Sequence, residues 1–279
     1  MNAAVEVAGL FGPGSVSWRV DREVVVLAGG SCALLMQAAH PVVAAGVIEH
    51  STYATDPVGR LLRTLSTSYA VAFGSAAEAD AALRRVNAIH ATVRGRLPGS
   101  SEPYSAMDPE ALLWVHATLV DTALRVYSRF VAPLSPAEEQ AYHDESRHVA
   151  ERLGVPPAAI PATLTELRGW MRDMIESRRV RVTPAARTIA ATVLYPRRFP
   201  PRLAWDAAHV VSLSVLPPAL RRQYGIGWSV RRERGVERLA HASRRALPWM
   251  PSLVRHVPQA RAAAERVRRA QAGQVAAGS

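Results

Sequence analysis

The chain has one cysteine and no lysine. Cys32 has no partner for an intrachain disulfide, and the sequence contains neither a CxxC zinc motif nor a CxxCH motif for covalent haem attachment. The single cysteine fits a reducing compartment, and we predict a cytoplasmic protein. The formal net charge of +11 rests on arginine alone. Because alanine, glycine and proline are also common, we interpret this charge as replacement of lysine by arginine.

Signals for export, serine hydrolysis and phosphate binding are also missing. The N-terminus has no basic segment followed by an apolar one, so we expect no signal peptide. No GxSxG elbow occurs, and Gly12-Pro13-Gly14 does not open a helix in a βαβ setting. Neither a helix-turn-helix pattern nor an aromatic-interleaved basic strand accompanies the positive charge, so we expect no nucleic-acid partner.

One stretch of the chain carries no charged residue. No Asp, Glu, Arg or Lys lies between Glu23 and Glu49, a length that would cross a bilayer as a helix. However, Gly29-Gly30 and His40-Pro41 interrupt the stretch. We interpret it as a buried core helix, or as two helices joined near His40-Pro41.

Helix start signals recur along the rest of the chain. Asp56-Pro57 and Asp108-Pro109 pair an N-cap with a proline at the first helical position, and Ser135 has a glutamate three residues later. Ser75 caps a segment whose apolar positions, Ile89 among them, follow helical spacing. No strand alternation is convincing. We therefore predict an all-α fold, with a helical domain over residues 1–245 and an Arg/Ala-rich helical tail over residues 246–279 that frays at its end.

Polar residues are concentrated within apolar helical sequence between His40 and His116. Arg60, Arg63 and Thr64 stand at positions i, i+3 and i+4, so they share one helix face. Buried polar groups need partners, and the pattern therefore predicts a pocket rather than a solvated surface. The set comprises His40, Glu49, His50, Arg60, Arg63, Thr64, His90 and His116.

This polar set matches a haem site better than a metal site built from side chains. HExxH is missing, and Glu49 and His50 are adjacent and cannot share a helix face. His143 and His148 are five residues apart in a polar helix, where solvated histidines are expected. A noncovalent haem needs one axial histidine, apolar helix faces and cations for its propionates. His90 lies on an apolar face and would supply the axial nitrogen, although a packed core histidine has the same pattern.

Several motifs in order resemble one family. AHPVVAAGVIEHS, DPVGRLLRTL, NAIHATVRG, YSAMDPEALLWVHATLVDT and LPPALRRQYGIGWS resemble the MpaB-type oxygenases, whose rubber-oxygenase members are the latex-clearing proteins. The resemblance extends from about Phe11 to Arg232. The family has many bacterial members. It implies a single globin-like helical domain that holds haem b noncovalently in a pocket between helices. The implied activity uses dioxygen on a lipophilic small molecule, such as a prenyl compound or another alkene.

The resemblance also implies roles for individual residues. In latex-clearing members an arginine, a basic residue three positions later and a threonine directly after it lie at the haem, which Arg60, Arg63 and Thr64 match. The family's proximal histidine is followed by a Val-Arg pair, and His90 with Val93-Arg94 is the best match. His90 is therefore the implied iron ligand, and Arg60 and Thr64 are implied catalytic residues.

Two further residues are implied with different roles. Glu49 is the nearest candidate for the base proposed in rubber oxygenases, although its spacing to Arg60 is shorter than in that subfamily. His116 lies in a WVHATLV motif typical of the smaller bacterial members, and would be a second axial ligand or a donor at the haem edge.

Two other functions stay open. A haem protein without oxygenase turnover, such as a sensor, carrier or electron-transfer protein, would be favoured by coordination through both His90 and His116. A cofactor-free interaction protein would use both histidines as packed core residues. Because the secretion signal of rubber oxygenases is missing, we do not expect an extracellular polymer as substrate. The uncharged stretch and the basic tail suit a lipophilic substrate and peripheral membrane contact, by analogy with fungal family members.

Overall fold

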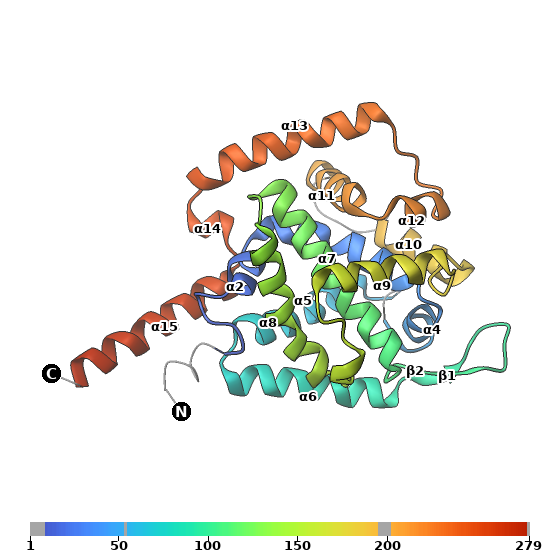
Figure 1. Ribbon diagram of the computed structural model, residues 1–279, viewed down its shortest axis with the longest axis horizontal. Helices are drawn as coiled ribbons and strands as arrows, with labels where there is room; N and C mark the ends of the chain where they lie inside the picture. The colour runs from blue at the N-terminus through green and yellow to red at the C-terminus, as the bar shows by residue number, and fades with distance from the viewer. Residues whose placement is uncertain (1–8, 53–54, 195–201, 278–279) are drawn as a thin grey trace.

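The computed structural model describes residues 9–52, 55–194 and 202–277 and confirms the all-α fold (Figure 1). The only strands among the described residues form a short antiparallel hairpin, β1 (Arg94–Arg96) and β2 (Pro103–Ser105), with Gly95 opposite Tyr104. The first helical elements are α2 (Val16–Asp21), η1 (Val24–Gly29), α3 (Gly30–Ala38), α4 (Pro41–His50), α5 (Pro57–Phe73) and α6 (Ala76–Thr92). After the hairpin come α7 (Pro109–Phe130), α8 (Pro136–Arg152), η2 (Pro157–Ala159), α9 (Leu164–Glu176), α10 (Pro184–Leu194), α11 (Arg202–Val215), α12 (Pro218–Gln223), α13 (Val230–Ala246), η3 (Leu247–Trp249), α14 (Ser252–Arg255) and α15 (Pro258–Ala277).

The predicted helix starts are confirmed by their capping bonds. The Asp56 carboxylate accepts from the backbone N–H of Gly59, and the Asp108 carboxylate accepts from that of Ala111. Ser75 and Ser135 each form a complete capping box with the glutamate three residues later. Each cap satisfies backbone donors that the first turn of a helix leaves unpaired, which is why such local signals locate helix starts.

The core is built around α7, the central helix in Figure 1. Trp114 is fully buried, and its indole N–H donates to the Met36 carbonyl of α3 at 2.9 Å. Gly29 lets η1 approach the same helix, because a Cβ atom there would lie 2.7 Å from Cγ2 of Thr122. The uncharged stretch of the sequence is thus packed against α7.

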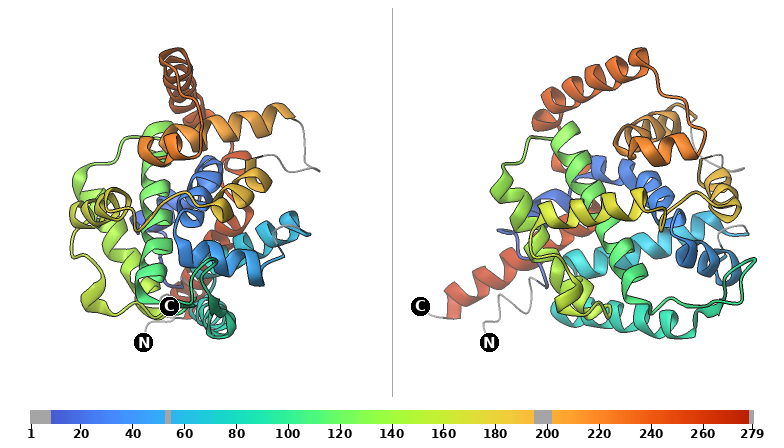
Figure 2. Two further views of the ribbon diagram at one scale, coloured as in Figure 1. Left: turned by 90° about the vertical axis from the view of Figure 1, so that its right-hand side faces the viewer. Right: turned by 45° about the vertical axis from the view of Figure 1, so that its right-hand side comes forward.

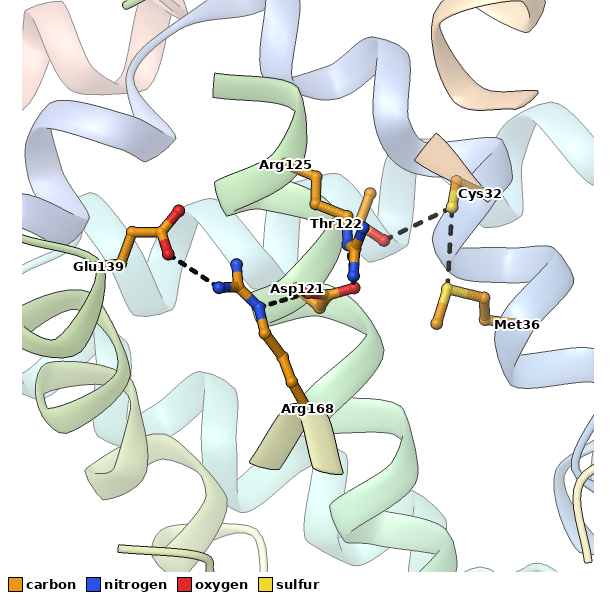
Figure 3. A network of polar contacts seen from close by, with 7 residues as sticks. All are labelled: Cys32, Met36, Asp121, Thr122, Arg125, Glu139 and Arg168. Carbon is orange, nitrogen blue, oxygen red and sulfur yellow. Dashed lines mark hydrogen bonds and ion pairs between the residues drawn. The ribbon is translucent and has the colours of Figure 1, made fainter. Parts of the chain in front are cut away.

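A polar network fixes α7 to its neighbours (Figure 3). The buried Asp121 carboxylate accepts from Arg125 Nε at 2.6 Å and from Arg168 Nε of α9 at 3.0 Å. Arg168 also donates to Glu139 of α8 at 2.8 Å. Because a buried carboxylate needs compensating donors, this network sets the relative positions of three helices.

The interpretation of the uncharged stretch as two helices joined near His40-Pro41 is confirmed. The Val24–Ala38 segment and the Pro41–His50 helix meet at an angle of 104°. Within the described ranges, no single helix has the length and apolar composition needed to cross a bilayer, and these two segments meet that test only as a bent pair. Cys32, Leu35 and Met36 of α3 are buried in the main core.

The residues after 245 contact the beginning of the chain. Val257, Ala260 and Ala263 pack with Trp18 of α2 and Phe73 of α5. Figure 1 shows that α15 then extends beyond the rest of the fold. This helix extends to Ala277. The division into residues 1–245 and 246–279 stays a prediction.

Candidate functional site

The face of α5 that carries the expected site residues is mostly exposed. Arg63 turns back to the helix start, where Nη1 lies 3.1 Å from Oδ2 of Asp56 and Nη2 donates to the Thr52 hydroxyl at 2.9 Å. The Thr64 hydroxyl donates to the Arg60 carbonyl of its own helix at 3.0 Å. Arg63 and Thr64 are therefore satisfied locally.

Arg60 differs from its neighbours. Its side chain is half-buried, and no hydrogen bond or ion pair to it occurs within the described residues. Burial, and secondarily the positive charge of Arg63, lowers its pKa from the usual value. A guanidinium in a partly buried position without an anion favours binding of a carboxylate or phosphate, whose oxygens match its donors.

His90 lies in the last turn of α6, on the packed face and half-buried. The neighbouring apolar position Ile89, expected on the same face, is instead 56% exposed. The His90 Nδ1 atom is buried without a hydrogen-bond partner among the described residues. Burial lowers the pKa of the imidazole below its usual value, so the ring is neutral at pH 7 and able to coordinate a metal.

Arg60 and His90 lie at the same end of a helical hairpin. The helices α5 and α6 pack side by side and are joined only by Gly74 and Ser75. Arg60 precedes this turn, and His90 follows it, by nearly equal lengths of helix, each roughly 20 Å at 1.5 Å per residue. The hairpin thus brings the two unpartnered groups to its open end, although 30 residues separate them in sequence.

Glu49 faces the β1–β2 hairpin. Its Oε2 atom accepts from the Tyr104 hydroxyl at 2.5 Å and lies 3.8 Å from His50 Nε2. Gly95 permits this approach, because a Cβ there would lie 2.6 Å from the Glu49 Oε2. No hydrogen bond or ion pair joins Glu49 to Arg60 in the part of the chain described. Tyr104 is a contact that the sequence does not signal, since it depends on how the hairpin packs against α4.

His116 is buried on α7, toward α8. Its Nε2 atom has no partner in the described ranges, and its pKa is lowered to about 4, first by burial and then by His143. His143 was expected to be solvated, but it is fully buried and its Nε2 donates to the Pro161 carbonyl at 2.9 Å. Pro161, which accepts this hydrogen bond, lies in the loop between η2 and α9, 18 residues after His143 in the chain. Coordination of iron by His116 stays a prediction.

The buried histidine makes stability depend on pH. A histidine whose pKa falls from 6.5 to about 4 on folding contributes stability above pH 6.5 that is lost as the pH drops toward 4. We expect protonation of His116 to account for a loss on the order of 3 kcal/mol in the free energy of unfolding of the wild-type protein over this range. His116→Gln should lose that much less, because glutamine does not titrate. Urea unfolding at pH 6.5 and pH 4 measures the difference. His148→Gln, which removes an imidazole that is 74% exposed, is the control. If His116→Gln loses as much stability between pH 6.5 and pH 4 as the wild-type protein does, the prediction is wrong.

Neither the cysteine nor a cluster of metal-binding side chains provides a second candidate site within the described residues. Burial raises the pKa of the Cys32 thiol to about 12, so the thiol stays protonated and unreactive. Within the described residues, no group of three or more His, Cys, Asp or Glu side chains is placed to hold a metal ion.

The fold and the sequence together define an all-α oxygenase catalytic domain. Residues 18–245 match the family model described as ER-bound oxygenase mpaB/B′/rubber oxygenase, catalytic domain, and the chain belongs to this family. No curated protein and no solved structure matches the chain at a significant level. The family establishes an oxygenase domain, which acts with dioxygen on a substrate.

Proposed function

We propose that the chain is a haem b-dependent oxygenase that acts with dioxygen on a lipophilic substrate carrying a prenyl or other alkene group. The observation that carries this proposal is the placement of His90 and Arg60 at the same end of the α5–α6 hairpin. Both are half-buried, both lack a partner within the described residues, and both lie at the open end of the α5–α6 hairpin.

The residues present fit a haem better than an iron held by side chains. A porphyrin supplies four iron ligands, so the protein needs only one histidine and does not need a cluster of three. The neutral imidazole of His90 meets that requirement, and Arg60 provides a cation for a propionate. Buried polar atoms usually have a partner, and the buried His90 Nδ1 lacks one within the described part of the chain, which leaves this nitrogen available to bind iron.

Haem, when bound, supplies the site at which dioxygen is taken up and activated. The side chains of this chain would bind, orient and move protons. Arg60 holds an anionic group through its guanidinium. Thr64 keeps its hydroxyl on its own helix, one turn from Arg60. Glu49 accepts a hydrogen bond from the Tyr104 hydroxyl, which orients the carboxylate that would accept a proton.

An absorption spectrum tests this proposal. Protein expressed with a haem precursor is measured oxidised, reduced and with carbon monoxide, and oxygen uptake is then followed with a prenyl alkene. We expect a Soret band that carbon monoxide shifts, and uptake that depends on the alkene. A bis-histidine spectrum that carbon monoxide leaves unchanged would favour a haem protein without turnover. Absence of a Soret band in folded protein would refute the proposal.

Replacement of Arg60 gives a more specific prediction. Arg60→Ala removes a charge-assisted contact to the propionate, and we expect haem affinity to fall by roughly tenfold or more. Haem titration of the apoprotein measures the change. Arg85→Ala, on the exposed side of α6, is the matched control; equal affinities in the two variants would remove Arg60 from the site.

A further inference from the structure

A short segment after α13 exposes large apolar side chains. Trp249 is 89% exposed, Leu253 is 68% exposed and Val254 is 56% exposed, and Met250 is also on the surface. These four residues, which we call the apolar edge, belong to six consecutive positions that include the end of η3 and most of α14. Exposed apolar groups this close together mark interaction sites in proteins.

The apolar edge is held firmly against the protein. Leu247 is buried at its beginning. At its end, Arg255 Nη2 lies 2.8 Å from Oε1 of the fully buried Glu23, and His256 forms a backbone bridge with that residue. The side chains therefore point outward from an anchored segment, and their exposure does not come from a loose chain end.

Arginine is concentrated in the part of the chain that contains the apolar edge. Residues 230–279 contain eleven arginines and three glutamates, which leaves this part with eight of the eleven net positive charges. Arg231, Arg234 and Arg245 are exposed, and their guanidinium groups have no partner within the described residues. Arg245 lies four residues before Trp249, whereas Arg231 and Arg234 lie at the other end of α13, so the positive surface runs along this helix and leads to the apolar edge. A positive surface joined to exposed apolar groups indicates an acidic partner that also accepts apolar side chains.

The arrangement in space is open to a large flat partner. Figures 1 and 2 show α13 at the outer edge of the fold, where its C-terminal end contacts the end of α7 through a Ser243 hydroxyl that donates to the Phe130 carbonyl; η3 and α14 follow it. Val236 and Ala240 form the buried side of α13, whereas Arg231, Arg234 and Arg245 are exposed on the rest of its surface.

We propose that the apolar edge and the arginines of α13 bind the surface of an anionic lipid bilayer. Tryptophan and aliphatic side chains enter the interface between headgroups and acyl chains, while arginines attract anionic headgroups. A second copy of this chain would bring two strongly positive surfaces together, and a nucleic acid would leave the aliphatic side chains without an apolar environment. The proposal concerns a surface separate from Arg60 and His90 and does not depend on haem.

Vesicle co-sedimentation of the full chain tests the proposal. Vesicles contain phosphatidylcholine alone or phosphatidylcholine with 30% phosphatidylglycerol, at about 50 and 500 mM salt. We expect at least roughly tenfold tighter binding to the anionic vesicles at low salt, and loss of that preference at high salt. Trp249→Ser with Leu253→Ser should weaken binding by about tenfold or more, as should Arg234→Gln with Arg245→Gln.

Matched controls separate this surface from general charge and hydrophobicity. Arg84→Gln with Arg85→Gln removes two exposed charges on α6, and Leu119→Ser removes an apolar side chain that is half exposed on α7. Circular dichroism confirms that each variant folds. The proposal is overturned if anionic vesicles are not bound, or if the controls weaken binding as much as the test variants. It is also overturned if light scattering shows a dimer that Trp249→Ser abolishes, or if DNA binds as tightly as the vesicles.

Discussion

Replacing His90 with alanine is expected to abolish haem retention while leaving the helical fold intact. His90 is the histidine that the α5–α6 hairpin places level with Arg60. Its imidazole is half-buried and neutral, so it can bind a metal ion. Without an axial ligand, only apolar contacts and propionate contacts hold a noncovalent haem. We expect haem affinity to drop by more than about a hundredfold, measured by Soret absorbance after gel filtration and by titration of the apoprotein.

Two further variants make this result interpretable. His50→Ala removes an exposed imidazole beside Glu49, and should retain haem with an unchanged spectrum. Adding imidazole to His90→Ala should restore a Soret band, because the free ligand replaces the deleted side chain at the iron. If His90→Ala retains full haem with the wild-type spectrum, His90 is not the ligand, and His116 or His40 becomes the next candidate.

Sequence patterns predict the features that depend on contacts within one helix, namely where a helix starts and which of its faces is packed. The caps at Asp56, Ser75, Asp108 and Ser135 locate four helix starts, because the bonds that they make lie within one turn. The spacing within α6 places His90 on the packed face for the same reason. The Gly74–Ser75 turn then suffices to bring His90 level with Arg60.

Contacts between distant segments are not encoded in such patterns. The sequence around His143 predicts a solvated polar helix, yet the side chain is buried and its Nε2 contacts the Pro161 carbonyl of the loop between η2 and α9. The resemblance implies that Glu49 is a candidate catalytic base, and the sequence does not indicate that Tyr104 of β2 donates a hydrogen bond to it. Periodicity reports which face of an element is apolar, and it does not report which partner covers a polar residue on the other face.

Glu23 is the clearest case, since in the sequence it only marks the beginning of the uncharged stretch. In the structure it has no exposed surface, and its carboxylate accepts from Arg255 Nε at 3.0 and 2.8 Å, across 232 residues of chain. Arg22 and His256 lie farther from the carboxylate, at 3.7 and 3.5 Å. One buried charge therefore depends mainly on one residue near the C-terminus.

Arg255→Ala should accordingly destabilise the whole fold. It leaves a buried carboxylate with only the weaker contacts of Arg22 and His256, and we expect a loss of about 3 kcal/mol in the free energy of unfolding. Urea unfolding at pH 7 measures the loss. Arg268→Ala, which breaks an exposed pair with Glu265, should change stability by less than about 0.5 kcal/mol.

The double variant Glu23→Leu with Arg255→Met separates charge from packing. It removes both ions and keeps similar side-chain volume, so it should be more stable than Arg255→Ala even though it changes two residues. If the double variant is instead the less stable, the stability lost in Arg255→Ala comes from lost packing around Arg255. The unpaired carboxylate of Glu23 is then not its cause. If Arg255→Ala costs no more than Arg268→Ala, the C-terminal segment does not stabilise the helical domain through Glu23.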